Sequence, residues 1–229
     1  MQTYVDRAAE KGEQYTYVVT AVDRLHNESV ASEAVTLTAA EPAVPLFPDL
    51  TPVAWAQEAI QQLTALGIVK GDVDGKFRPL KAVTRAEFAA MLVRAFDLWD
   101  DGTPLNWNDV KETDWHYTVI AAAKQAGLVQ GTGKDRFEPN RPITRQEMAV
   151  MATKALAAFT STPEAADAES VLARFKDREA IASYAAKAVA TLAQAGIVKG
   201  TGSGLFHPKG EANRAQAAVI VWNIVQKKE

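Results

Sequence analysis

The stretch Gly71–Glu87 reads GDVDGKFRPLKAVTRAE, and two later stretches of the chain share its pattern. The second, Gly131–Glu147, reads GTGKDRFEPNRPITRQE, and the third, Gly200–Gln216, reads GTGSGLFHPKGEANRAQ. In each copy a Phe follows the Gly by six positions, and an Arg follows that Phe by eight. Self-similarity at a fixed period is typical of a repeat architecture, so these stretches decide the fold.

Further landmarks recur around the three stretches. An Asp, an aromatic residue and a Gly precede each copy, with a period of 60 residues and then of 69 between the Arg positions. The second interval is longer because the linker Thr160–Ala173 is extended and one residue is added before Tyr184. The aligned landmarks are Asp49, Asp109 and Asp177; Trp55, Trp115 and Tyr184; and Gly67, Gly127 and Gly196.

Each copy predicts a helix, a loop and a second helix. The apolar residues of the first helix in copy one recur at helical spacing, and both later copies repeat the spacing. We interpret these stripes as core-facing. Gly67 and its counterparts fall where a left-handed C-terminal cap is expected. The first-helix stripe of copy one consists of Trp55, Ala59, Ile60, Leu63 and Leu66.

A capping box is predicted at the start of each second helix. Thr84 and Glu87 fit the box, as do Thr144 and Glu147, and Asn213 with Gln216 is a compatible variant.

The Arg between the two capping residues has no such structural explanation. Arg85, Arg145 and Arg214 each place a cation in a first helical turn, which opposes the helix dipole at a cost of about 0.3–1 kcal/mol. One explanation is an ion pair with a nearby acid, for which the landmark Asp residues are candidates. The other is a site for a carboxylate or phosphate, formed by free helix N–H groups and the guanidinium. One Arg could serve both roles.

Composition excludes several classes of function. The chain has 229 residues, a net charge of −3 and no Cys, so it lacks the basic field of a nucleic-acid binder and the thiols of disulfides or Cys-type zinc sites. The sequence contains no run of 18 apolar residues, so we expect no membrane-spanning segment in it. The three His residues lie in unrelated contexts, and no Ser/His/Asp or paired-carboxylate motif stands out. We therefore predict no catalytic residue, no metal site and no cofactor.

Residues 1–40 have β character. Residues 15–22 and 34–38 are rich in β-branched and aromatic residues and predict two strands. They resemble the last two strands of a fibronectin type III domain, in which Tyr15 or Tyr17 would be the corner tyrosine. Since such a domain needs roughly 100 residues, we expect the rest of it, and a signal peptide, upstream in a longer parent protein. Residues 41–46 form a Pro-rich linker.

The repeats resemble S-layer homology (SLH) domains over residues 47–228. The matching motifs in copy one are Phe47-Pro48-Asp49, Trp55-Ala56, the segment 67–71 (GIVKG), the segment 74–79 (DGKFRP) and the segment 84–87 (TRAE). The resemblance implies a mainly α fold, a pseudo-threefold triplet with a central helix bundle and grooves between adjacent repeats. The expected boundaries are 47–100 for repeat one, 101–160 for repeat two, 161–173 for a linker and 174–229 for repeat three.

The resemblance also implies a function. SLH domains attach exported proteins non-covalently to the secondary cell-wall polysaccharide of Gram-positive-type bacteria, through pyruvylated N-acetylmannosamine. We therefore expect a monomeric, non-catalytic, extracellular wall-anchoring module. Its parent could be a surface enzyme, such as a glycoside hydrolase, or an S-layer structural protein. Copy three departs most from the pattern, so its groove is expected to bind weakest. Carried over by position, the ligand contacts are Arg85, Arg145, Arg214, Asp49, Asp109, Asp177, Trp55, Trp115, Tyr184, Gly71, Gly131 and Gly200.

Overall fold

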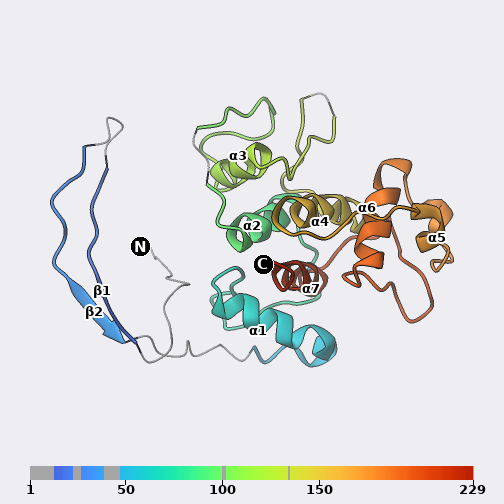
Figure 1. Cartoon of the computed structure of the whole chain (residues 1–229), viewed down its shortest axis with the longest axis horizontal. Coiled ribbons are helices and arrows are strands. Elements are labelled where there is room, and N and C mark those ends of the chain that lie inside the picture. The colour runs from blue at the N-terminus through green and yellow to red at the C-terminus, as the bar shows by residue number, and fades with distance from the viewer. Residues whose placement is uncertain (1–12, 23–26, 39–46, 100–101, 134, 229) are drawn as a thin grey trace. The chain divides into compact units, whose positions relative to one another are not determined.

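Helices dominate the part of the chain that the structure, a computed structural model, describes, namely residues 13–22, 27–38, 47–99, 102–133 and 135–228 (Figure 1). The chain divides into two compact units, Met1–Val44 and Pro45–Glu229. The expected fold class, mainly α with a short N-terminal β-hairpin, is confirmed. The predicted linker 41–46 lies outside the described residues.

The N-terminal unit contains one antiparallel hairpin of strands β1 (Gln14–Tyr17) and β2 (Val35–Thr38). The first strand is shorter than predicted, because the Val19 N–H donates to the Ser32 hydroxyl at 3.0 Å rather than to a ladder carbonyl. The likeness to fibronectin type III and the corner role of Tyr15 or Tyr17 stay predictions.

The second unit holds three outer helices (α1, α3 and α6) and three inner helices (α2, α4 and α7), one of each kind per predicted repeat. The inner helices contact one another and form the centre of this unit in Figure 1. The elements are η1 (Thr51–Ala56), α1 (Gln57–Ala65), α2 (Arg85–Ala95), α3 (Tyr117–Gln125), α4 (Arg145–Phe159), α5 (Ala168–Leu172), η2 (Arg178–Ala180), α6 (Ser183–Gln194) and α7 (Arg214–Val225).

Each outer helix packs on an inner helix of the preceding repeat rather than of its own. Helix α3 packs on α2, α6 packs on α4, and α1 closes the cycle by packing on α7. The repeats are therefore interlocked, and no single repeat buries both of its helices alone.

The helix ends follow the sequence signals. At the end of α1, the Ile68 N–H donates to the Leu63 carbonyl at 2.8 Å and the Gly67 N–H to the Thr64 carbonyl at 3.0 Å. This is a Schellman motif, and Gly67 adopts the left-handed φ of 68° that it requires. The three predicted capping boxes are present at the starts of α2, α4 and α7.

A closed ring of backbone hydrogen bonds joins the segments that lead into the inner helices. The Val83 N–H donates to the Ala212 carbonyl at 2.9 Å, the Ala212 N–H to the Ile143 carbonyl at 2.9 Å, and the Ile143 N–H to the Val83 carbonyl at 3.0 Å. One residue from each repeat takes part, and all three are fully buried. This ring is the clearest expression of the pseudo-threefold symmetry.

Trp55, Trp115 and Tyr184 are not core residues. The sequence placed them on core-facing stripes, but their exposed fractions are 59%, 59% and 61%. Trp55 lies in the 3-10 helix η1 and Trp115 precedes α3, so neither shares the phase of the α-helical stripe that follows. The stripe prediction was wrong for these aromatic residues.

The expected linker 161–173 is partly structured. Residues Ala168–Leu172 form α5, whose start is capped by the Asp167 carboxylate accepting from the Ser170 N–H at 3.0 Å. Helix α5 packs on α6, and Leu172 is buried. No helix in the described part of the chain has the length and apolar character needed to cross a bilayer.

Candidate functional site

The Arg85 side chain reaches from repeat one into repeat two. Its Nε donates to the Phe137 carbonyl at 2.8 Å and its Nη2 to the Gln130 carbonyl at 3.0 Å. The guanidinium also lies 4.7 Å from the centroid of the Phe137 ring. Only 4% of the residue is exposed, and burial lowers the pKa of its guanidinium.

The same contacts recur around the pseudo-threefold cycle. Arg145 donates from Nε to the Phe206 carbonyl of repeat three at 2.7 Å and lies over that ring. Arg214 donates to the Phe77 and Lys70 carbonyls of repeat one, both at 2.9 Å, and lies over the Phe77 ring. Each Arg therefore ties its own repeat to the next, and Arg214 closes the ring.

The helix starts do not offer free N–H groups. The Arg85 N–H donates to the Arg141 carbonyl at 3.0 Å, the Ala86 N–H to the Pro139 carbonyl at 3.0 Å, and the Glu87 N–H to the Thr84 hydroxyl at 3.2 Å. Helices α4 and α7 repeat this arrangement. The hypothesis of an anion bound by backbone N–H groups at these helix starts was wrong, because carbonyls of the neighbouring repeat and the capping side chain already accept from these groups.

Asp49, Asp109 and Asp177 hold the loops of their own repeats. Asp49 accepts from the Phe77 N–H at 3.0 Å and from the Arg78 N–H at 2.7 Å. Asp109 and Asp177 make the equivalent pairs of bonds. Among the described residues none of the three forms an ion pair with the repeat Arg side chains. The residue after each buried Phe adopts a left-handed φ of 55° to 58°, which these bonds help to hold.

Acid is expected to remove this contribution to stability. Burial raises the pKa of Asp49 and Asp177, but the backbone hydrogen bonds outweigh it, so both pKa values lie below the ordinary 3.8. A depressed pKa stabilises the fold above that value, and the benefit is lost as pH falls through the native pKa. The Asp49→Asn/Asp177→Asn variant should be less stable than the parent at pH 7.

Urea unfolding at pH 7 and pH 3 checks this expectation. The difference in free energy of unfolding between parent and variant should be smaller at pH 3 than at pH 7, because the carboxylates of the unfolded parent are protonated below the ordinary pKa of 3.8 while the folded parent resists protonation. An equal difference at both pH values would contradict the role assigned to these carboxylates.

Gly71, Gly131 and Gly200 each pack against an aromatic residue of their own repeat. A Cβ at Gly71 would lie 2.4 Å from the Phe47 ring, and one at Gly131 would lie 2.6 Å from Trp107 and 2.7 Å from the Arg136 carbonyl. Close packing explains these two glycines, while Gly200 also needs its positive φ of 76°.

Two grooves collect residues from all three repeats. Groove one lies on α2 and encloses about 220 Å³, and groove two lies on α4 and encloses about 340 Å³. Groove one is lined by Ile68, Lys70, Glu87, Arg94, Trp115 and Arg214. Groove two is lined by Arg85, Leu128, Gly131, Glu147, Lys154 and Tyr184.

The predicted Arg and aromatic residues meet in these grooves, but they come from different repeats. Groove one combines Arg214 of repeat three with Trp115 of repeat two, and groove two combines Arg85 of repeat one with Tyr184 of repeat three. The divergent residues of copy three are thus shared among the grooves. Asp49, Asp109, Asp177, Gly71, Gly200, Arg145 and Trp55 line neither groove.

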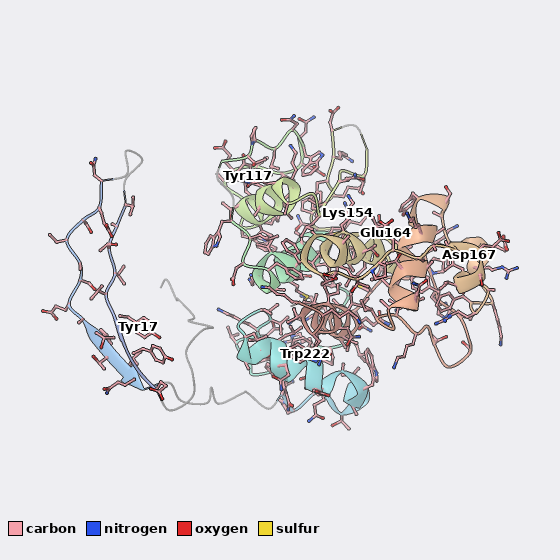
Figure 2. All side chains as sticks on the ribbon, in the orientation of Figure 1. Tyr17, Tyr117, Lys154, Glu164, Asp167 and Trp222 are labelled. Atoms are coloured by element: carbon pink, nitrogen blue, oxygen red, sulfur yellow. The ribbon has the colours of Figure 1, made fainter. Side chains whose placement is uncertain are left out.

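Each groove also has a cation that the sequence analysis missed. Lys154, on α4 (Figure 2), and Arg94, on α2, follow the capping Glu of their helix by seven positions. Residues seven apart share a helix face, so this spacing could have revealed them. Burial lowers the pKa of both side chains. Repeat three has Asn223 at this position.

The chain belongs to the S-layer homology domain family, whose sequence model matches residues 46–89, 108–149 and 174–218. An amylopullulanase of Thermoanaerobacterium thermosulfurigenes is 39% identical over 174 residues, which cover 76% of this chain and 9% of the relative. The exoglucanase XynX of Acetivibrio thermocellus is 38% identical over 174 residues, covering 76% and 16%. A surface-layer 125 kDa protein of Lysinibacillus sphaericus is 31% identical over 169 residues, covering 72% and 14%. This chain therefore spans a small part of each of these relatives.

Proposed function

We propose that this chain is a non-catalytic module that anchors a larger exported protein to the bacterial cell wall. The ligand is an anionic secondary wall polysaccharide that carries pyruvate ketals on N-acetylmannosamine. Family membership supports the anchoring role, and the chemistry of the grooves supports the class of ligand.

The observation that carries the proposal is the composition of groove two. Arg85 and Lys154 bring two cations to a hollow of about 340 Å³, and Tyr184 stands at its edge with 61% of its surface exposed. An exposed ring suits the apolar face of a sugar, and a guanidinium suits the carboxylate of a pyruvate ketal. Groove one repeats this set with Arg214, Arg94 and Trp115.

The relatives indicate only the class of protein to which the module is attached. They include polysaccharide-degrading enzymes and surface-layer proteins, so the parent is an anchored enzyme or an S-layer subunit. The hairpin supports a further β-domain in the parent. Val35 and Leu37 on β2 are more than half exposed, and two strands alone are marginal in water.

The exposed aromatic residues give a test that leaves the core intact. The variant Trp115→Ala/Tyr184→Ala, which removes the exposed ring of each groove, should bind purified wall polysaccharide roughly fivefold or more weakly, because each lost stacking contact costs about 0.5–1.5 kcal/mol. Isothermal titration with the soluble polymer measures the affinity. Removal of the pyruvate ketals from the polymer should weaken binding to the parent protein in the same assay.

Trp99→Ala is the matched control. Trp99 is 83% exposed and lines neither groove, so its loss should leave binding unchanged. If the Trp115→Ala/Tyr184→Ala variant kept the affinity of the parent with an unchanged circular dichroism spectrum, the grooves would not be the binding sites.

A further inference from the structure

Groove two contains an acidic side chain beside the cation that the ligand is proposed to meet. Glu147 Oε1 lies 3.7 Å from Arg85 Nη1, and the Glu147 side chain is 16% exposed. Its other oxygen, Oε2, accepts from the Thr144 N–H at 2.9 Å and completes the capping box of α4. An anion that approaches Arg85 therefore meets a carboxylate already present in the groove.

Arg141 binds that carboxylate through two parallel hydrogen bonds. Its Nη2 donates to Glu147 Oε1 at 2.6 Å and its Nη1 donates to Glu147 Oε2 at 3.1 Å. Burial raises the pKa of Glu147, but the bonds from Arg141 and Thr144 outweigh it and hold that pKa below its usual range. Arg141 also contacts Glu138 and the Pro142 carbonyl, at 2.8 Å and 3.3 Å. It does not line groove two.

The other two repeats show a matching pattern at these positions. Repeat one has Lys81 six positions before Glu87, the spacing of Arg141 and Glu147, so its sequence again has a cation with the capping acid. Repeat three has Gly210 and Gln216, and thus lacks both the cation and the acid. Gln216 completes the capping box of α7 without a charge, so the cap alone does not require an acid at this position. The acid occurs only in the two repeats that also have a cation six positions earlier.

We propose that Arg141 is a positioning residue that neutralises Glu147 and so leaves the positive charge of Arg85 available to an anionic ligand in groove two. This inference rests on the proposed function. Arg141 acts through Glu147 without touching the ligand. Without Arg141, the Glu147 carboxylate turns to Arg85 as its counter-ion and repels the carboxylate of the ligand.

The test compares binding in a background in which groove one is weakened, so that groove two makes the larger contribution. All variants carry Trp55→Ala and Trp115→Ala, which remove one exposed aromatic ring from groove one and another from repeat one. Isothermal titration with purified pyruvylated wall polysaccharide then compares four proteins: this background, and the background with Arg141→Ala, with Glu147→Gln, and with both. Gln216 is the precedent within this chain for Gln in the capping box.

Arg141→Ala should weaken binding about five- to tenfold, the effect of one uncompensated charge near a half-buried site. Glu147→Gln should bind more tightly than the background, because it removes the carboxylate beside Arg85, and Arg141→Ala/Glu147→Gln should match Glu147→Gln. Against the polymer stripped of its ketals, Arg141→Ala should have no effect. A merely structural salt bridge would predict neither this rescue nor this dependence on ligand charge.

Three results would overturn the inference in distinguishable ways. If the protein without any substitution fails to bind the polymer, the proposed function falls and the inference with it. If that protein binds and the background does not, groove two is no binding site. If the background binds and Arg141→Ala leaves the affinity unchanged, or Glu147→Gln fails to rescue it, then Arg141 does not act through Glu147.

Discussion

Replacement of Arg85 by alanine is expected to destabilise the protein by about 2–4 kcal/mol, the range for loss of a buried, hydrogen-bonded network. The change removes donors from the Phe137 and Gln130 carbonyls and empties the space over the Phe137 ring. Because these contacts cross from repeat one to repeat two, the loss weakens the junction between repeats.

Urea unfolding followed by circular dichroism measures the effect. Arg85→Met is the informative control, since it keeps much of the apolar stem over the ring and removes the donors. It should be more stable than Arg85→Ala and less stable than the parent. Arg145→Ala and Arg214→Ala should each be destabilising too, because their contacts recur at the other two junctions. Unchanged stability in all three alanine variants would contradict the role of the Arg ties.

This structural role changes how binding data on Arg variants should be interpreted. The sequence alone suggested that Arg214 matters least, since copy three diverges most from the repeat pattern. The structure places Arg214 in groove one with Arg94 and Trp115. The corresponding residues in groove two are Arg85, Lys154 and Tyr184, so Arg214 is the counterpart of Arg85. We therefore expect Arg214 to matter as much as Arg85. Weaker binding by an Arg variant is informative only where its folded fraction matches that of the parent.

Local signals in the sequence predicted local structure well. The boxes at Thr84, Thr144 and Asn213 and the cap at Gly67 depend on residues a few positions apart, so their spacing was sufficient. The repeat period predicted three equivalent helix-loop-helix units because equivalent sequences adopt equivalent structures, while their pseudo-threefold arrangement was implied by the resemblance to S-layer homology domains.

Partners from other repeats could not be predicted in the same way. The sequence showed that Arg85 opposes its helix dipole and needs a partner, but the partners are carbonyls 45 and 52 positions away in the next repeat. Carbonyl groups carry no side-chain signature, so no pattern of residue types marks them. The packing of each outer helix on an inner helix of another repeat depends on the order of the repeats around the pseudo-threefold axis, which no local pattern encodes. The exposed position of Trp115 beside α2 depends on the same order.

Removal of repeat three is expected to abolish cooperative folding of the remaining two. A chain of residues 1–160 lacks α7, on which α1 packs and which contacts both α2 and α4. It also lacks α6, which covers α4. The free energy lost by exposing these apolar faces to water should exceed the roughly 5–15 kcal/mol by which native domains are stable.

The backbone ring explains why a two-repeat fragment cannot compensate by a small adjustment. Without Ala212, the Val83 N–H loses its acceptor and the Ile143 carbonyl loses its donor, although both residues belong to the repeats that remain. Each Arg tie needs a following repeat, so Arg145 loses the Phe206 carbonyl and repeat one loses Arg214.

We expect residues 1–160 to show reduced helicity and no sigmoidal thermal transition by circular dichroism. Residues 45–229, which keep the whole helical unit, are the control and should melt in one transition like the full chain. Addition of a separate fragment of residues 161–229 to the two-repeat chain should restore helicity, because it supplies α6, α7 and the Ala212 link. A sharp transition in residues 1–160 alone would show that two repeats are self-sufficient and that the closed ring is not required for folding.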